Sequence, residues 1–331
     1  MAADTSSARG AERRFRAMGS AAQVIVVGGP VGLVDMAQHR IDELERRWSR
    51  FLDDSDITNL NRSAGTFVEV SADTVTLLQR AVEAWRLTGG AFDPTVLGAV
   101  IRAGFDRSFE QLGPTPEPGA SQLGIGAEHI AVAGTTACLP TGVGFDPGGI
   151  GKGLAADLVC ADLMAAGADG ACVNLGGDVA VRGIGPDGNG WTVAVEYPGR
   201  PEPIALIGLA NGAVATTTTL RRRWHSSGVA RHHLIDPQTG LPSGSDVVLV
   251  AVVAGDTWLA EVLAKAVLLA GATHPFDIIG GTGAQGLVVD DRGRIVASPN
   301  LAEFLGRAQL PRTVACGEAF PAHSPAALSR R

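Results

Sequence analysis

Apolar and polar positions along the chain follow two periods, and the helical period comes first. Between residues 34 and 51, Ile41, Leu44 and Trp48 recur at helical spacing, while the charged residues lie mostly on other faces. The stretch 72–87 repeats this pattern and ends at Gly-Gly, which is typical of a helix C-terminus. The predicted helices are 34–51, 72–87, a small-residue run at 149–166 and a nearly all-apolar run at 258–270.

Short β-like apolar runs dominate the second half of the chain. The predicted strands are 24–27, 171–175, 179–182, 191–196, 204–209 and 247–253, with a hairpin formed by 287–289 and 295–297. Helices followed by strands with interspersed helices favour an α+β fold over a regular βαβ repeat. We expect a mixed or antiparallel sheet flanked by helices over residues 15–312, as one domain or two subdomains. A loose arm at 1–14 and a loose tail at 313–331 are expected to flank it.

Composition narrows the classes of function. The chain has 331 residues and a net charge of −7, which argues against a general nucleic-acid binder. No stretch approaches the roughly 20 apolar residues that a membrane span needs. The N-terminal residues show no apolar run after a basic start, so we expect a cytoplasmic protein without membrane insertion. The four cysteines are scattered without ligand-like spacing, and we interpret them as structural thiols.

Lysine is rare in this sequence. Lys152 and Lys265 are the two lysines, and arginine supplies every other basic residue of the Lys and Arg total. A compact ammonium and a planar guanidinium form different interactions, so these two positions are candidates for a specific role.

Lys152 follows a glycine-rich segment, residues 142–153. Glycines before a helix let backbone N–H groups approach an anion, and the helix start adds partial positive charge. The segment is not a Walker A loop, because Gly153 stands where that loop has Ser or Thr. It is not a Rossmann fingerprint either, because no G-x-G-x-x-G opens a first βα unit. Taken alone, the segment is explained equally well by a structural turn.

Six segments, in order, resemble motifs of the ApbE family of FAD:protein FMN transferases. The segment Asp146 to Asp157 is similar to D-x-G-G-I-A-K-G-x-A-x-D, and Thr88 to Val96 is similar to T-x-G-A-F-D-P-T-V. The remaining matches are Ala17 to Ser20 (A-M-G-T), Ser49 to Asn61 (S-x-[YF]-x-x-x-S-[ED]-[IL]-x-x-[LF]-N), Asn174 to Asp178 (N-x-G-G-D) and His233 to Pro242 (H-I-I-D-P-x-T-G-x-P).

The resemblance implies both an activity and a set of site residues. FAD would be cleaved at its diphosphate, with FMN passed to a Ser or Thr hydroxyl of an acceptor flavoprotein, AMP released and Mg²⁺ assisting. Thr217 belongs to a Thr216–Thr219 run that presents hydroxyls to flavin or phosphate, or else forms a β edge. The residues implied to bind FAD are Met18, Phe51, Ala91, Phe92, Asp93, Asp146, Lys152, Thr217 and Leu234.

The residues implied for catalysis are His233, Lys152 and Asp236. Phosphoryl transfer needs its charge neutralised, which the Lys152 ammonium provides, and it needs a proton acceptor for the attacking hydroxyl. His233 titrates near neutral pH and suits that second task, whereas the adjacent His232 faces the other way on an extended segment. The intact His233 and Asp236 pair favours retained chemistry. FAD diphosphatase activity, or FAD binding without catalysis, are the alternatives.

The chain departs from the family at the implied metal site. The resemblance implies that the metal is held by the backbone carbonyl of Gly149 and by an Asp and a Thr side chain of a helix that reads A-D-A-x-A-T in the family. This sequence has Glu261 in place of that Asp and Lys265 in place of that Thr. Residues four apart share a helix face, so an ordinary surface ion pair is one interpretation. The helix is otherwise free of charged residues, which favours burial of the pair. Our hypothesis is that the Lys265 ammonium takes over part of the cation's place and weakens or abolishes Mg²⁺ binding.

Overall fold

The computed structural model describes residues 10–105, 124–221, 223–226, 229–232, 234–306 and 310. At its centre is an eight-stranded sheet in which every neighbouring pair of strands is antiparallel. The α+β prediction is confirmed. The strands, in spatial order, are β1 (Ala11–Ala17), β2 (Ser20–Val27), β6 (Gly170–Leu175), β7 (Asp178–Gly183), β10 (Gly212–Thr218), β15 (Val247–Ala254), β16 (Gln285–Asp290) and β17 (Ile295–Ala297).

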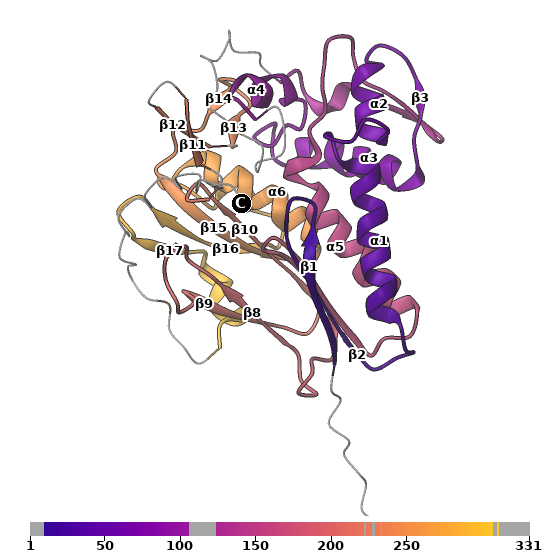
Figure 1. The fold of residues 1–331 in the computed structure, drawn as a ribbon. Coiled ribbons are helices and arrows are strands. Elements are labelled where there is room, and N and C mark those ends of the chain that lie inside the picture. Colours follow the sequence, from indigo (N-terminus) through magenta and orange to yellow (C-terminus); the bar gives the residue numbers. More distant parts are fainter. Residues whose placement is uncertain are drawn as a thin grey trace, which may run out of the picture.

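Helices cover one face of this sheet (Figure 1). Helix α5 (Gly151–Ala165) packs on β6 and β7, and α6 (Thr257–Ala270) packs on β10 and β15. Helix α1 (Leu33–Trp48) packs on α5, with α3 (Ala72–Leu87) farther out. No helix in the part of the chain described is long and apolar enough to span a bilayer.

Smaller elements complete the fold. The hairpin of β8 (Trp191–Val195) and β9 (Ala205–Leu209) covers the opposite face of the sheet, together with the 3₁₀ turn η5 (Pro299–Phe304). The others are α2 (Asp56–Arg62), α4 (Leu97–Arg102), β3 (Val68–Glu69), β4 (Ala131–Ala133), β5 (Thr136–Cys138), β11 (Arg223–Ser226), β12 (Val229–His232), β13 (Ile235–Asp236), β14 (Leu241–Pro242), η2 (Ala127–His129), η3 (Pro147–Gly149) and η4 (Asp277–Ile279).

The unbroken apolar runs in the sequence reflect burial on both faces of the sheet. In β15, Leu249 and Val253 pack toward the β8–β9 hairpin, whereas Val250 and Val252 pack against α6. Successive residues of a strand face opposite sides, so a strand covered on both sides needs no polar alternation.

Strands β1 and β10 are among the elements that were not anticipated from the sequence. β1 begins at Ala11, inside the stretch 1–14 expected as a loose arm, and residues 1–9 lie outside those described. This edge strand carries mostly exposed and charged side chains, which conceal its β character. Most of the threonine-rich run belongs to β10, and its residues 216–218 pair with β15 alone, because β7 pairs only with residues 212–215, so the alternative of a β edge agrees with the pairing there. Among the residues that the structure describes, the threonines of β10 therefore have one paired neighbour, β15, and no strand partner on the side of β7.

Helices α5 and α6 meet at their N-terminal ends. A Cβ on Gly153 would lie 2.6 Å from the carbonyl oxygen of Thr257, so only glycine permits this approach. The partly buried carboxylate of Asp157 accepts the backbone N–H groups of Thr257 and Trp258, each at 2.9 Å, and thereby caps α6. These contacts place the start of α5, with Lys152, beside the middle of α6.

Replacing Gly153 with alanine tests this approach. We expect Gly153→Ala to lower the free energy of unfolding by about 1–3 kcal/mol, because the added methyl group overpacks a contact with backbone atoms. Urea denaturation measures the change. Gly244→Ala is the matched control, because a Cβ at Gly244 meets nothing within 4 Å. Equal stability of the two variants would contradict the proposed role of Gly153.

Candidate functional site

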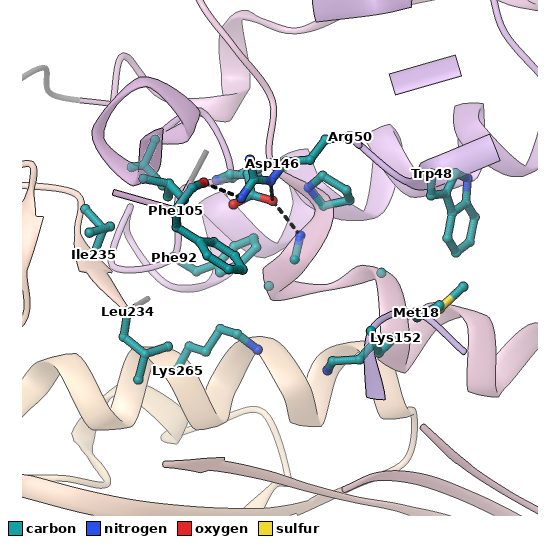
Figure 2. Close-up of a pocket in the computed structure, with 18 of the residues that line it drawn as sticks. Met18, Trp48, Arg50, Phe92, Phe105, Asp146, Lys152, Leu234, Ile235 and Lys265 are labelled. Carbon is teal, nitrogen blue, oxygen red and sulfur yellow. Dashed lines mark hydrogen bonds and ion pairs between the residues drawn. The ribbon is translucent and has the colours of Figure 1, made fainter. Parts of the chain in front are cut away.

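A cavity of about 520 Å³ opens above the helix face of the sheet, a size typical of small-molecule sites. Its walls come from segments far apart in sequence, as Figure 2 shows. They are the β1–β2 turn, the end of α1 and residues 49–51, the loops 91–96 and 146–152, residues 234–237, and α6. Five of the six segments that resemble ApbE motifs therefore line one cavity.

The β1–β2 turn presents Met18 to the cavity. Ala17 pairs with Ser20, which leaves Met18 and Gly19 as a two-residue turn with φ of 50° and 63°. Positive φ at both positions is the type I′ geometry that suits tight hairpins. Met18 is the single non-glycine residue with positive φ among the residues described, and such strain is concentrated at functional positions.

The loop after α3 is held by hydrogen bonds within the chain. The Thr88 hydroxyl donates to the Ala84 carbonyl at 2.8 Å and accepts the Phe92 N–H at 3.0 Å. The buried Asp93 carboxylate accepts the Thr95 N–H at 2.9 Å, the Thr95 hydroxyl at 2.6 Å and the Gly126 N–H at 3.0 Å. Asp93 borders the cavity, but these hydrogen bonds fix the loop that carries Phe92.

The loop 146–152 is anchored from α2. The Asn61 side chain accepts the Phe145 N–H at 2.7 Å and donates to the Phe145 carbonyl at 3.0 Å. The next residue, Asp146, accepts the Gly148 N–H at 3.0 Å and so shapes the turn into α5. A Cβ on Gly149 would lie 2.6 Å from the Phe92 ring, so glycine allows the two walls of the cavity to touch.

Arg50 and two phenylalanines form a further part of the wall. The guanidinium carbon of Arg50 lies 4.2 Å from the ring centroid of Phe51 and 4.9 Å from that of Phe105. Its Nε lies 3.6 Å from the Asp146 carboxylate. The sequence analysis missed Arg50 and Phe105. Arg50 lies inside the matched segment that contains Phe51, which was the available signal.

A buried cluster of four charged side chains forms the floor. Lys152 of α5 donates to Asp178 at the start of β7 and, at 2.8 Å, to Glu261 of α6. Lys265, one turn later on α6, donates to the same oxygen of Glu261 at 3.0 Å. The Gly153 N–H donates to the other oxygen of Glu261 at 2.8 Å. In Figure 2 the amino groups of Lys152 and Lys265 point toward one another.

Burial and pairing set the charges of this floor cluster, which comprises Lys152, Asp178, Glu261 and Lys265. Burial would raise the pKa of Glu261, but the two ammonium groups outweigh it and hold the pKa at about 2. Burial would lower the pKa of Lys152, but Asp178 and Glu261 raise it above its ordinary value. Burial, aided by the negative charge of Glu261, raises the pKa of Asp178 to about 6. The pair of Lys152 and Glu261 is therefore firmly ionised, whereas burial lowers the pKa of Lys265 despite its pairing with Glu261.

The residues implied to hold Mg²⁺ do not fit a divalent cation. Both carboxylate oxygens of Glu261 already accept hydrogen bonds, and a lysine ammonium offers donors only. The Lys265 stem lies against Gly149, with its Cδ 3.4 Å from where a Gly149 Cβ would stand. Within the described part of the chain, no group of three or more His, Cys, Asp or Glu side chains is arranged to bind a metal ion. An oxygen-rich shell of the kind that Mg²⁺ requires is not formed by these residues.

A second cavity, of about 780 Å³, lies on the side of the sheet covered by the β8–β9 hairpin. Its lining includes the polar side chains of Asn174, Thr216 and Thr218. It shares four residues with the first cavity, namely Gly19, Gly148, Lys152 and Lys265. The two lysines of the chain therefore border both cavities.

Most of the residues expected from the sequence border the first cavity. Glu261 is fully buried beneath the two lysines. Thr217 borders the second cavity instead. Asp236 borders neither, and its carboxylate accepts the Gln238 N–H at 2.8 Å. His233 lies outside the residues described. Those that line the first cavity are Met18, Phe51, Ala91, Phe92, Asp93, Asp146, Gly149, Lys152, Leu234 and Lys265.

Comparison with known proteins agrees with this geometry. The model of the ApbE family matches residues 18–285. A "FAD:protein FMN transferase" of Vibrio cholerae is 28% identical over 278 residues, covering 81% of this chain and 83% of the relative. A protein of Haemophilus influenzae with the same name is 28% identical over 251 residues, covering 72% of each chain.

Solved structures give the same assignment. The crystal structure of an ApbE protein from Thermotoga maritima superposes with a TM-score of 0.80 at 27% identity, covering 89% of this chain and 99% of that one. The flavin transferase ApbE from Vibrio cholerae has a TM-score of 0.75 at 24% identity, which shows a shared fold. The chain belongs to the ApbE family.

Proposed function

We propose that this protein is an FAD:protein FMN transferase, which cleaves the FAD diphosphate and attaches FMN to a Ser or Thr hydroxyl of an acceptor flavoprotein. One observation carries the proposal. Five of the six segments that match the family meet around a single cavity with apolar and aromatic walls and with two lysine ammonium groups at its floor. Flat aromatic rings suit such walls, and a diphosphate suits such a floor.

The residues would divide the work as follows. Met18, Phe92 and Leu234 contribute apolar surface to hold the rings of FAD. Lys152, at the start of α5, neutralises the diphosphate together with the helix N-terminus. His233 is proposed to take the proton of the attacking hydroxyl. Because Gly149, Glu261 and Lys265 do not fit Mg²⁺, no step is assigned to a metal.

Mass spectrometry tests the proposal. The purified protein is incubated with FAD and a candidate acceptor flavoprotein domain, and the acceptor's mass is measured alongside the release of AMP. Addition of FMN to the acceptor supports transfer. Free FMN and AMP without a change in acceptor mass would instead identify an FAD diphosphatase. Tight binding of FAD without either product would identify a non-catalytic flavin-binding protein.

The second cavity is the route we propose for the acceptor. In-line transfer needs the nucleophile to approach the phosphorus opposite the leaving group, so it enters from a side that FAD does not fill. The second cavity meets the first at Lys152 and Lys265, and its mixed polar and apolar walls include threonine and asparagine side chains that suit a hydroxyl-bearing segment. This arrangement supports a path for the acceptor along the β8–β9 side of the sheet.

An arginine introduced into the second cavity tests the acceptor route, because it should impair use of the acceptor without changing FAD binding. Ala194 on β8 is exposed and borders the second cavity but not the first. We expect Ala194→Arg to lower kcat/KM for the acceptor by at least ~10-fold, the effect of misplacing a reactant, while the Kd for FAD is unchanged. Ala161→Arg, at an exposed position of α5 outside both cavities, is the control. Equal acceptor kinetics in the two variants would refute the route.

A further inference from the structure

We propose that the ammonium of Lys265 is a built-in cation for the FAD diphosphate, and that this protein transfers FMN without a bound divalent metal. The inference rests on the proposed function and specifies how the charge of the reacting phosphates is neutralised. It follows from what Lys265 contacts and from what a metal ion would have to displace.

Lys265 is placed to act on a ligand at the meeting point of the two cavities. Its ammonium pairs with one carboxylate, that of Glu261, whereas Lys152 pairs with both Glu261 and Asp178. The Lys265 ammonium also approaches the Glu261 backbone carbonyl at 3.5 Å. An ammonium has three N–H donors, so Lys265 retains capacity for a phosphate oxygen.

A metal ion at the same place would meet opposition. It would lie close to two ammonium groups, and the carboxylate implied as its ligand, Glu261, already accepts hydrogen bonds from both of them and from the Gly153 N–H. The Lys265 stem also fills the space against Gly149. Displacing Lys265 would leave its charge buried among apolar residues of α6, which is strongly unfavourable.

The fixed ammonium suits the bond changes of the transfer. The acceptor oxygen forms a bond to the FMN phosphorus while the bond from that phosphorus to the bridging oxygen breaks. AMP leaves with the bridging oxygen and its electron pair, and the hydroxyl proton passes to a base. Negative charge grows on the leaving phosphate, where Lys265 and Lys152 stabilise it as oriented donors.

The first experiment measures metal binding directly. Mn²⁺ is titrated into the chelator-treated protein at saturating FAD, and bound Mn²⁺ is read by electron paramagnetic resonance. We expect no bound Mn²⁺ in the wild-type protein and a new site in Lys265→Thr, in which Glu261 loses one of its two ammonium partners and a hydroxyl is added. Lys265→Met lacks both the charge and the hydroxyl, so it should gain no site. A stoichiometric Mn²⁺ site in the wild-type protein would overturn the proposal.

The second experiment measures transfer in EDTA and in added Mg²⁺. Wild-type activity should be the same in both, and Lys265→Thr should lose at least ~100-fold in EDTA, as expected when an oriented donor is removed. Mg²⁺ should restore much of the activity of Lys265→Thr and none of that of Lys265→Met. Full dependence of the wild-type enzyme on Mg²⁺ contradicts the proposal, and thermal melting of each variant checks that it is folded.

A measurement of FAD affinity distinguishes the proposed transferase function from the proposed role of Lys265. Flavin fluorescence in EDTA gives the Kd for FAD without any acceptor, and we expect Lys265→Met to weaken it at least ~10-fold. If no transfer is observed in any condition but Lys265→Met still weakens FAD binding, the proposed function is wrong, whereas the proposal that Lys265 acts as a cation for the diphosphate is supported. An unchanged Kd in Lys265→Met, together with normal transfer, would refute the proposal that Lys265 is the internal cation and would leave the proposed transferase activity supported.

Discussion

Lys152→Met is expected to cause the largest combined loss of stability and activity. The substitution removes the ammonium that Asp178 and Glu261 share, and both carboxylates are almost completely buried. Glu261 keeps its hydrogen bonds from Lys265 and the Gly153 N–H, but Asp178 loses its ion pair with Lys152. Removing one partner from a buried ion pair costs about 3–5 kcal/mol, and urea denaturation measures that loss. FMN transfer should fall by at least ~100-fold, because an oriented cation at the diphosphate is lost.

A double substitution separates the two effects. Lys152→Met combined with Asp178→Asn removes both the ammonium and the carboxylate that it leaves unpaired. We expect this pair to recover much of the lost stability, since the remaining Glu261 and Lys265 form a balanced ion pair. Transfer should stay low in the double variant. Recovery of transfer together with stability would mean that Lys152 acts only through the fold.

The architecture was largely predictable because burial leaves a clear periodic signal. Residues 72–87 were predicted as a helix and form α3 with the same bounds. The run 247–253 was predicted as a strand and forms β15, whose two faces are both covered. β1 and β10 were missed because charged and threonine-rich strands resemble loops or edges in a single sequence. The sheet order was also inaccessible, because it is set by contacts between distant segments.

The site was predictable where a residue belongs to a local motif. Lys152 and Met18 lie in short segments whose backbone dictates where their side chains point. The pairing of Lys265 with Glu261 followed from their helical spacing and is confirmed at 3.0 Å. That Lys152 joins the same cluster, and that Asp178 completes it, depends on packing among α5, α6 and β7. The local sequence signal for Asp178 was its position as the acidic residue that ends the matched segment Asn174 to Asp178.

Asp93→Ala should have the second largest effect, and it separates two roles for this residue. The Asp93 carboxylate accepts two backbone N–H groups, of Thr95 and Gly126, and the Thr95 hydroxyl. Leaving buried donors without an acceptor costs about 1–3 kcal/mol each, so we expect a loss of about 2–4 kcal/mol by urea denaturation. FAD affinity should fall as well, since this loop carries Phe92 into the cavity.

The more conservative Asp93→Asn decides whether the carboxylate also contacts FAD. Asp93→Asn preserves the size of the side chain and one acceptor oxygen, so the hydrogen bonds from Thr95 can remain. The new NH₂ group would face the Gly126 N–H, and because both groups are donors that hydrogen bond would be lost. If the role of Asp93 is to shape the loop, stability and FAD affinity should fall together across Asp93→Asn and Asp93→Ala. A large loss of FAD affinity in Asp93→Asn at wild-type stability would instead assign the carboxylate a direct contact with the flavin substrate. Measuring stability and FAD affinity on the same two variants therefore tests whether Asp93 binds FAD, as the family resemblance implies, or only holds the loop in place, which its hydrogen bonds already explain.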